Sequence, residues 1–421
     1  MTDPDQTPAP APPPALDEQL AALGPREIAV GLPTYNNAAT VAAVVAAVQA
    51  GLRAHFPEAT ALVINSDAGS LDRTPEVLAE SGVPVVLTRH EAPSGERAAV
   101  PFHGVPGRDA ALRLTLDVAR RVGARVLVVL EADVPSIDAG WIERLVRPAW
   151  DEKADLVVPA YARHRYEGTI TNLLLAPLVR ALFGRRLRQP LGGAYALSLR
   201  LLEHAQALPG RPASGRDLLE LWLVGTAIAD GFALREAWLG PRRVESRTRT
   251  TDLPTMVAQS LGALFTLMER YEPLWLAVVG SEPVPALGEA APLATAPTAV
   301  DVERLVGAFR RGVRDLVQIW ELILTPETLG DVLSLEVRDA AAYRFADPVW
   351  ARVVYEFALG HHFGVVHGDH LLRSLVPLYL GRTAALVNAT QAASAAATEA
   401  ALERVGAAFE RAKPYLVERW R

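Results

Sequence analysis

The sequence predicts an α/β protein in which helices sandwich a mostly parallel sheet, followed by an all-helical C-terminal region. Short apolar runs alternate with segments of helical periodicity from residue 26 to about residue 240, which is the pattern of βαβ units. From residue 300 onward, every periodic segment is helical. Polar clusters directly follow several of the apolar runs. Ligands bind at the carboxyl ends of parallel strands, so we expect the functional site at that edge of the sheet.

Composition excludes several classes of protein. The chain has 421 residues, half of them hydrophobic, and at roughly 150 residues per domain this length corresponds to two or three domains. Cysteine is absent, which excludes disulfides, thiolate zinc sites and a cysteine nucleophile. A net charge of −6 argues against nucleic-acid binding. No apolar run reaches the roughly 18 residues of a membrane helix, and the acidic, proline-rich start is not a signal peptide, so we expect a cytoplasmic protein.

We expect four parts along the chain. Residues 1–25 are expected to form a disordered Pro/Ala-rich tail, with room for a short helix near 16–23. An α/β domain is expected over 26–272, a linker over 273–299 and a helical domain over 300–421. Strands are expected over 27–32, 61–64, 83–88, 125–130, 155–159, 192–198 and 233–239. Helices are expected over 40–52, 74–81, 109–122, 170–183, 217–230, 255–271, 300–323, 327–341, 347–359, 367–378 and 383–414.

The segment Glu131-Ala132-Asp133 follows the clearest buried strand of the sequence. Two carboxylates one residue apart at such a place can hold a divalent cation, or its water, against a diphosphate. Mg²⁺ and Mn²⁺ prefer these oxygen ligands. The other interpretation is that Asp133 caps the turn before Pro135.

Two further polar clusters follow the first two strands. Pro33, Tyr35 and Asn36 either form a nucleotide-binding turn, which offers backbone groups and an aromatic ring to a base, or an ordinary turn into the next helix. Asp67 either hydrogen-bonds a ribose or base, or forms an Asx turn.

Two glycine-containing loops complete the candidate site. The loop 104–109 opens a helix, where backbone N–H groups beside Arg108 favour a phosphate. It matches neither GxGxxG nor the P-loop, which disfavours a Rossmann dehydrogenase and a P-loop NTPase. Gly192 and Gly193 are adjacent without an obvious turn role, which indicates a ligand close to the backbone.

The order and spacing of these motifs resemble a known family. Besides the segments above, the resemblance rests on Tyr166-Glu167-Gly168-Thr169-Ile170-Thr171-Asn172 and Arg188-Gln189-Pro190-Leu191-Gly192-Gly193. The sequence is similar to the GT-A-fold glycosyltransferases related to mannosylglycerate synthase and glucosyl-3-phosphoglycerate synthase. The similarity runs from about residue 27 to 272, and more loosely through the helical tail.

The resemblance implies a retaining transfer of glucose or mannose from UDP-glucose or GDP-mannose to a small acid such as D-glycerate, with Mg²⁺ or Mn²⁺ as cofactor. The product would be a compatible solute of the glucosylglycerate or mannosylglycerate kind. Asp133 and Glu220 are the expected catalytic residues. The expected nucleotide-binding residues are Pro33, Tyr35, Asn36, Asp67, Arg108, Glu131 and Ala132; the acceptor-binding residues are Gly168, Thr169, Thr171, Leu191, Gly192 and Gly193. The expected metal ligands are Asp133, Glu131 and Glu245.

The sequence departs from the family pattern at several positions. The first acid of the metal motif is Glu131 instead of Asp, and Glu245 falls about where the family carries a metal-ligating His. Ala194 stands where an acid often follows the glycine pair. Thr169 replaces the Arg of the phosphoglycerate-using relatives, which favours an unphosphorylated acid. Four nearby arginines form either a solvated basic face or a diphosphate site: Arg242, Arg243, Arg247 and Arg249.

Two functional interpretations follow from these observations. In the first, the protein is a hexosyltransferase whose partners are the nucleotide-sugar donor and the small-acid acceptor, with no nucleic acid and no membrane span; a homodimer is left open. In the alternative, it is a catalytically weakened nucleotide-sugar-binding relative with a binding or regulatory role. Turnover of a nucleotide sugar distinguishes the two.

Overall fold

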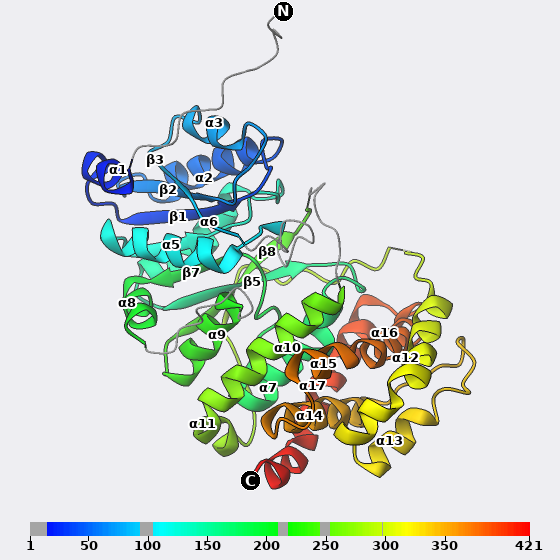
Figure 1. Cartoon of the computed structure of the whole chain (residues 1–421). Coiled ribbons are helices and arrows are strands. Elements are labelled where there is room, and N and C mark those ends of the chain that lie inside the picture. Colours follow the sequence, from blue (N-terminus) through cyan, green and yellow to red (C-terminus); the bar gives the residue numbers. More distant parts are fainter. Residues whose placement is uncertain (1–14, 93–103, 209–217, 245–252, 297) are drawn as a thin grey trace, which may run out of the picture.

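The computed structural model of the protein describes residues 15–92, 104–208, 218–244, 253–296 and 298–421. Its main strands are β1 (Ile28–Thr34), β2 (Ala61–Asp67), β3 (Val85–Arg89), β4 (Val126–Val129), β5 (Leu156–Ala162), β7 (Tyr195–Ser198), β8 (Leu234–Pro241) and β10 (Ala286–Leu287). They form one eight-stranded sheet in the order β10-β8-β5-β7-β4-β1-β2-β3 (Figure 1). All neighbours are parallel except the pairs of β7 with β4 and with β5. The predicted fold class is confirmed.

Helices cover the sheet and continue beyond it. They are α1 (Leu16–Leu23), α2 (Val41–His55), α3 (Thr74–Ala79), α5 (Arg108–Arg121), α6 (Ala139–Trp150), the π-helical turn η2 (Thr171–Leu175), α7 (Ala176–Phe183), α8 (Leu199–Ala207), α9 (Leu219–Ala229), α10 (Leu253–Arg270) and α11 (Glu272–Ala277). The remaining helices are α12 (Val302–Ile323), α13 (Pro326–Leu333), α14 (Asp347–His362), α15 (Gly368–Ser374), α16 (Val376–Thr390) and α17 (Ala395–Trp420). Within the described ranges, every helix is too short or too polar to cross a membrane.

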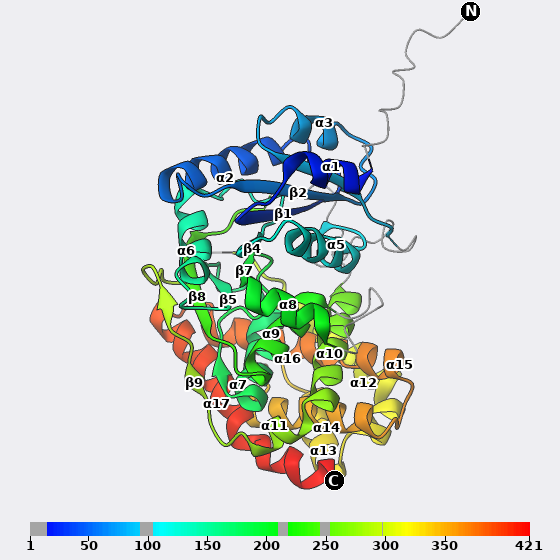
Figure 2. The ribbon, with the colours of Figure 1, turned by 90° about the vertical axis from the view of Figure 1, so that its left-hand side faces the viewer.

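Strand β1 divides its side chains between the two faces of the sheet. Ile28, Val30 and Leu32 join the apolar cluster of α2 and α6, whereas Ala29 joins the cluster of α5. This alternation with a period of two buries both faces of the strand. Figure 2 shows α2 and α6 on one side of the sheet and α5 on the other. Because both faces of the strand are covered, polar side chains can gather only at the ends of the strands.

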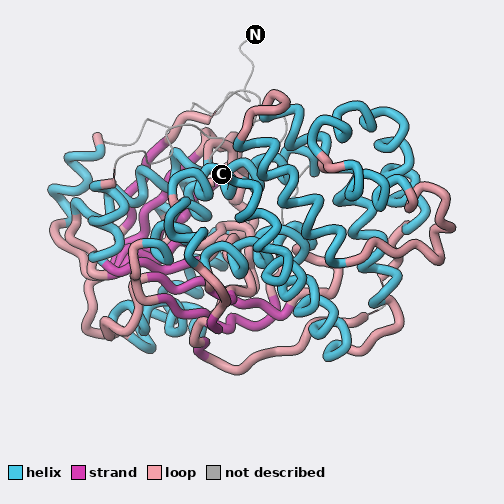
Figure 3. Tube along the Cα trace, turned by 90° about the horizontal axis from the view of Figure 1, so that it is seen from below, coloured by secondary structure: helices cyan, strands magenta, loops and turns pink. Residues whose placement is uncertain are grey.

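The C-terminal helices share a core with the α/β part. One apolar cluster extends from Leu112 of α5 through α7 to Phe409 of α17, and its members are almost fully buried. Helix α17 packs along both α7 and α14. Figure 3 shows the helices filling the space beside the sheet. The helical region is therefore positioned to contribute side chains to a site at the sheet edge.

The structure corrects several expected boundaries. Within the expected tail 1–25, the short helix considered near 16–23 is present as α1, and its Gln19 side chain donates to the carbonyl of Leu87 at 2.9 Å. The expected linker contains α11 and two short strands, β9 (Glu282–Pro283), which pairs with β6 (Arg185–Arg186), and the sheet-edge strand β10. The single helix expected over 383–414 is wrong, because the chain breaks between α16 and α17, where Ser394 caps the second helix. Helices α6 and α8 were not expected; α6 contains Pro148, which obscures its helical pattern.

Candidate functional site at the carboxyl edge of the sheet

Strand register brings the predicted polar clusters to one edge of the sheet. Thr34 at the end of β1 lies beside Asp67 at the end of β2, and Gly31 of β1 lies beside Val129 of β4. The chain after β1, β2 and β4 therefore leaves the sheet at the same side. Because β7 is antiparallel to β4, its first residue Tyr195 pairs with Val129. The glycine pair just before β7 thus reaches the same edge.

The β1 and β2 ends form a tightly hydrogen-bonded corner. Asp67 is buried, and its Oδ1 accepts from the Thr34 hydroxyl at 2.8 Å. Its Oδ2 accepts from the backbone N–H groups of Gly69 and Ser70 at 2.9 and 2.7 Å. This is the Asx-turn alternative for Asp67, and the carboxylate is directed into the loop. That a base or ribose also contacts Asp67 stays a prediction.

Asn36 fixes the turn that follows β1. Its φ is 55°, a left-handed conformation that asparagine tolerates better than most residues. Its N–H donates to Ser70 Oγ, and its Oδ1 accepts from the Leu71 N–H, both at 2.8 Å. Pro33 is buried, whereas Tyr35 is half-buried. The exposed part of this corner is thus the turn around Tyr35 and Asn36.

Glu131 and Arg242 form a buried ion pair at the centre of the edge. Arg242 follows β8, and its Nε lies 3.1 Å from Glu131 Oε2, which Nη2 also contacts. The exposed fractions of the two side chains are 12% for Arg242 and 2% for Glu131. Burial opposes the charge of Arg242, but Glu131, Tyr161 and Asp133 together outweigh burial and raise the pKa of Arg242. The interpretation of Arg242 as part of a solvated face is therefore wrong.

Gly192 and Gly193 must be glycines because other side chains of the site approach their backbone closely. A Cβ at Gly193 would lie 2.5 Å from Glu131 Cδ, and the φ of Gly193 is +86°. A Cβ at Gly192 would lie 2.2 Å from Pro159 Cγ. Both values are far below any real contact of a Cβ atom, so only glycine fits. The neighbour at position 193 is the carboxylate of Glu131, in the middle of the candidate site.

A second buried ion pair joins α5 to α9. Arg108 Nη2 donates to Glu220 Oε1 at 2.5 Å and to the carbonyl of Gly193 at 3.1 Å. Burial opposes the charge of Arg108, but Glu220 and Glu131 outweigh it and raise the pKa of Arg108. Arg108 Nε and Nη1 have no hydrogen-bond partner within the described residues. Arg108 therefore lies between two carboxylates, with donors left over for a ligand.

Asp109 positions the helix that carries Glu220. Its Oδ1 accepts from the N–H of Leu219, the first residue of α9, at 3.1 Å. Burial raises the pKa of Asp109 to about 7, against the opposing effects of this hydrogen bond and of Arg113. The buried Tyr195 lies within the same electrostatic cluster, since Glu220, Arg108 and Asp109 all act on its hydroxyl. Neither Asp109 nor Tyr195 was expected; the adjacency of Asp109 to Arg108 was the available signal.

The expected acceptor loop lies beside this cluster and touches the helical region. Thr169 Oγ1 is 2.5 Å from the hydroxyl of Tyr379 in α16. Gly168 has a φ of +68°, and a Cβ there would lie 2.7 Å from Arg163 Nη1. Thr171 is buried in η2. The loop is thus held from one side by α16 and faces a guanidinium on the other.

Arg163 and Arg165 have different roles in this loop. Arg165 is buried and donates to the carbonyls of Thr390, Ala393 and Thr295, the last two at 2.9 and 2.8 Å. It therefore ties the loop to the helical region. Arg163 lies over the ring of Tyr161, 5.2 Å from its centroid. Burial and the charge of Arg242 lower the pKa of Arg163. Two neighbouring guanidiniums form a place for an anion.

The expected metal site is only partly described. The carboxylates of Glu131 and Asp133 are both buried after β4, which suits a hard divalent cation. Glu131 is engaged by Arg242, and Glu245 lies outside the described residues. Within the described part of the chain, no three His, Asp or Glu side chains gather closely enough to hold a metal ion. Asp133 therefore fits a cation, whereas Glu131 does so only when Arg242 moves.

The structure thus brings part of the predicted set together. Glu131, Gly193, Arg108 and Glu220 form one connected cluster. Leu191 instead belongs to the apolar core, and the carbonyl of Ala132 accepts from the Thr40 hydroxyl at 2.7 Å. No role was expected for Tyr161, which lies near both Arg163 and Arg242. The other expected residues flank the cluster, on the β1–β2 corner and on the acceptor loop: Pro33, Tyr35, Asn36, Asp67, Gly168, Thr169 and Thr171.

Comparison with known proteins finds similar solved structures. No protein-family model and no curated protein matches the chain. Glucosyl-3-phosphoglycerate synthase from Mycobacterium tuberculosis in complex with Mn²⁺, UDP and glucosyl-3-phosphoglycerate matches with 27% identity and a TM-score of 0.42, covering 63% of this chain and 87% of that one. The same enzyme with phosphoglyceric acid matches with 28% identity and a TM-score of 0.43, covering 62% and 86%. Another of its structures contains Mg²⁺ and UDP.

Proposed function

We propose that this chain is a retaining glycosyltransferase that moves a hexose from a nucleoside diphosphate sugar to a small hydroxy acid. The observation that carries the proposal is the convergence of two buried ion pairs on Gly193. Glu131, paired with Arg242, packs against the Cα of Gly193, and Arg108, paired with Glu220, donates to its carbonyl. The loop before β7 thus joins two charge pairs at the edge where parallel sheets bind ligands.

The donor is the ligand that these charges suit. Buried N–H groups are costly unless they find acceptors, and two nitrogens of Arg108 have none within the described residues. Phosphate or sugar oxygens would satisfy them. Arg242 offers a second guanidinium, which forms strong charge-assisted hydrogen bonds with phosphate. We therefore place the diphosphate beside Arg242 and the hexose beside Arg108 and Glu220.

The transfer itself is a charge-separation reaction. The bond from the anomeric carbon to the diphosphate breaks, and the bonding electrons leave with the phosphate oxygen. Arg242 stabilises the leaving anion, and the carboxylate of Glu220 stabilises the positive charge on the sugar. The acceptor hydroxyl attacks from the face that the diphosphate leaves, and its proton passes to the leaving phosphate oxygen. Mg²⁺ or Mn²⁺ at Asp133 would further neutralise the diphosphate.

The acceptor is held by the loop around Gly168. Arg163 stands beside Gly168, and the neighbouring Arg242 is already paired with Glu131, so one guanidinium remains to match the single negative charge of a carboxylate such as that of D-glycerate. Thr169 faces Tyr379 instead of adding a second cation. A phosphate carries nearly twice the charge of a carboxylate, so an unphosphorylated acid is the better partner.

Turnover tests this proposal directly. UDP-glucose and GDP-mannose are each incubated with D-glycerate or 3-phosphoglycerate and Mn²⁺, and kcat/KM is compared. We expect transfer to D-glycerate to be preferred, and Glu220→Gln to lower kcat by about 100-fold or more. Preference for 3-phosphoglycerate would contradict the acceptor assignment. Tight nucleotide-sugar binding without transfer to any acid would instead support the binding or regulatory alternative.

A further inference from the structure

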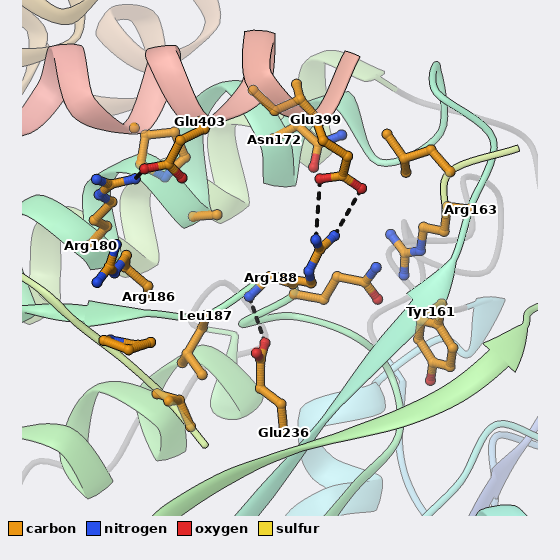
Figure 4. Close-up of a pocket in the computed structure, with 18 of the residues that line it drawn as sticks. Tyr161, Arg163, Asn172, Arg180, Arg186, Leu187, Arg188, Glu236, Glu399 and Glu403 are labelled. Atoms are coloured by element: carbon orange, nitrogen blue, oxygen red, sulfur yellow. Dashed lines mark hydrogen bonds and ion pairs between the residues drawn. The ribbon is translucent and has the colours of Figure 1, made fainter. Parts of the chain in front are cut away.

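A large cavity lined by both polar and apolar side chains opens beside the candidate site, between β5, α7 and α17 (Figure 4). Its volume is about 480 Å³. Cavities of roughly 300–1,000 Å³ hold drug-sized ligands, so a three-carbon acid would leave most of this space unfilled. Helix α17 supplies the far wall, including Glu399, Ala400 and Glu403. The helical region thus helps to build this cavity.

The cavity borders the proposed reaction centre. Tyr161 and Arg163 line its one end (Figure 4), and the guanidinium of Arg242 lies 5.6 Å from the centroid of the Tyr161 ring. Arg163 also faces Gly168 of the acceptor loop. A molecule whose reacting hydroxyl lies at this end would therefore extend into the cavity.

Two buried oxygen acceptors line the cavity. Gln189 is 6% exposed, and its Oε1 has no hydrogen-bond partner within the described residues. Glu236 is also 6% exposed, and its Oε1 accepts from the Arg188 N–H at 2.6 Å. Burial raises the pKa of Glu236 to about 7. Gln189 Oε1 thus lacks the donor that a buried acceptor requires, and a ligand hydroxyl group would provide it.

Most charges along the cavity are paired. Arg188 forms a fork with Glu399, at 3.1 and 3.2 Å, and Arg180 pairs with Glu403 at 2.7 Å. At the other end, Arg163 interacts with the cation Arg242 and with the carboxylates of Glu131 and Glu167, and Arg186 also lines the cavity. The guanidinium of Arg163 therefore suits an anion, whereas the paired charges of the body suit neutral polar groups.

We propose that this cavity binds a polyhydroxylated acid larger than glycerate, of the aldonic or uronic acid class. Its carboxylate lies at Arg163, and its hydroxyl groups donate to Gln189 and Glu236. The inference rests on the proposed function, because it takes the bound acid to be the acceptor of the hexose. Glycerate would fill only the Arg163 end of the same cavity.

Calorimetry with the full chain, without donor, tests the inference using gluconate and glucuronate as probes. D-Glycerate controls for size and glucose for charge. We expect Kd for at least one sugar acid to be about tenfold or more below that for glycerate and that for glucose. Gln189→Leu, which removes the oxygen acceptor, should raise the Kd of that acid by several-fold. The inference is overturned if both sugar acids bind no tighter than glycerate, or do not bind.

A second test fills the cavity with a large side chain. Ala400 is exposed on α17 and lines the cavity, so Ala400→Trp should raise the sugar-acid Kd by about tenfold and leave that of glycerate unchanged. Ala397, exposed on the same helix outside the cavity lining, gives the matched control Ala397→Trp. An unchanged Kd in Ala400→Trp contradicts the inference. Sugar-acid binding without hexose transfer would contradict only the proposed function, and transfer to glycerate without sugar-acid binding would contradict only this inference.

Discussion

The backbone of Gly193 packs directly against the carboxylate of Glu131, so that a Cβ at position 193 would lie 2.5 Å from Glu131 Cδ. The same glycine accepts a hydrogen bond from Arg108, the partner of Glu220. A shift of this loop would therefore disturb both ion pairs of the site. This explains why the chain has two glycines there, with the second in a left-handed conformation.

We expect Gly193→Ala to abolish nucleotide binding, because the new methyl group must displace Glu131. The substitution should also lower the free energy of unfolding by about 1–3 kcal/mol through backbone strain. Gly231→Ala is the matched control, since Gly231 has a φ of +74° but open space around its Cα. Gly231→Ala should lower the free energy of unfolding but leave nucleotide binding unchanged. Equal UDP or GDP titration curves for the two variants would contradict a special role for Gly193.

Arg242 and a divalent cation are expected to compete for Glu131. We predict that Arg242→Gln lowers the Kd for Mn²⁺ by about tenfold, because the competing cation is removed. Without metal, the variant should lose about 3–5 kcal/mol of unfolding free energy, since a buried carboxylate loses its partner. Arg243→Gln, at the exposed neighbouring residue, should change neither quantity. Metal titration followed by electron paramagnetic resonance measures the affinity, and an unchanged Kd in Arg242→Gln would show that Glu131 is not a ligand.

The contributions of Asp109 and Glu236 to stability should fall as the pH rises toward neutrality. The folded-state pKa of Asp109 is about 7, above its ordinary value of 3.8. Its contribution to stability is therefore fully present below pH 3.8 and is lost as the pH rises through about 7. The contribution of Glu236 to stability is likewise lost as the pH rises from 4.5 through about 7, the raised pKa of its carboxyl. Each pKa unit corresponds to about 1.4 kcal/mol of unfolding free energy.

Asp109→Asn and Glu236→Gln should flatten this pH dependence, because neither variant can ionise at that position. The amide that replaces the Asp109 carboxyl keeps an oxygen that can accept from the Leu219 N–H. Chemical denaturation at several pH values measures the effect. Asp117→Asn, at an exposed carboxylate of the same helix, is the control. If the Asp109 variant and this control show the same slope, the buried carboxyl is not the source.

Acceptor affinity should depend on Arg163. Arg163→Gln is expected to raise KM for D-glycerate by about 30-fold or more, since a buried carboxylate loses a charged partner worth at least about 2 kcal/mol. The effect on kcat should be small. Arg185→Gln, which removes an exposed ion pair with Glu282, should leave KM unchanged. A drop in kcat at constant KM would instead place Arg163 on the donor side.

Much of the fold was predictable from sequence because its signals are local. The runs around Val30 and Val128 are bare apolar strands, and the segments after them end in polar clusters. The short edge strand β10 carries no such signal, since two residues have no detectable period. The break between α16 and α17 lies in an Ala-rich stretch whose composition favours helix throughout, so only Ser394 marks it.

The residues of the candidate cluster could be named from the sequence, but the contacts between them could not. Glu131 and Glu220 were expected, yet their partners Arg242 and Arg108 come from segments about 110 residues away, with separations of 111 and 112. Sequence spacing contains no information on such contacts. Arg163, Arg165 and Arg188 all lie near the acceptor loop in the sequence, and only the fold shows what each of them contacts. Arg165 binds carbonyls and Arg188 binds Glu399, so Arg163 is the one that we propose for the acceptor.

The central claim, retaining hexose transfer at the Glu131–Glu220 edge, is tested most directly by the product itself. Wild-type protein is incubated with UDP-glucose or GDP-mannose, Mn²⁺ and the acids D-glycerate and gluconate, and the anomeric proton of the product is followed by NMR. Because both donors carry the α linkage, we predict a new α-glycoside that forms together with free UDP or GDP and is absent with Glu220→Gln. No glycoside with any donor and acid, or a β-glycoside, would contradict the account.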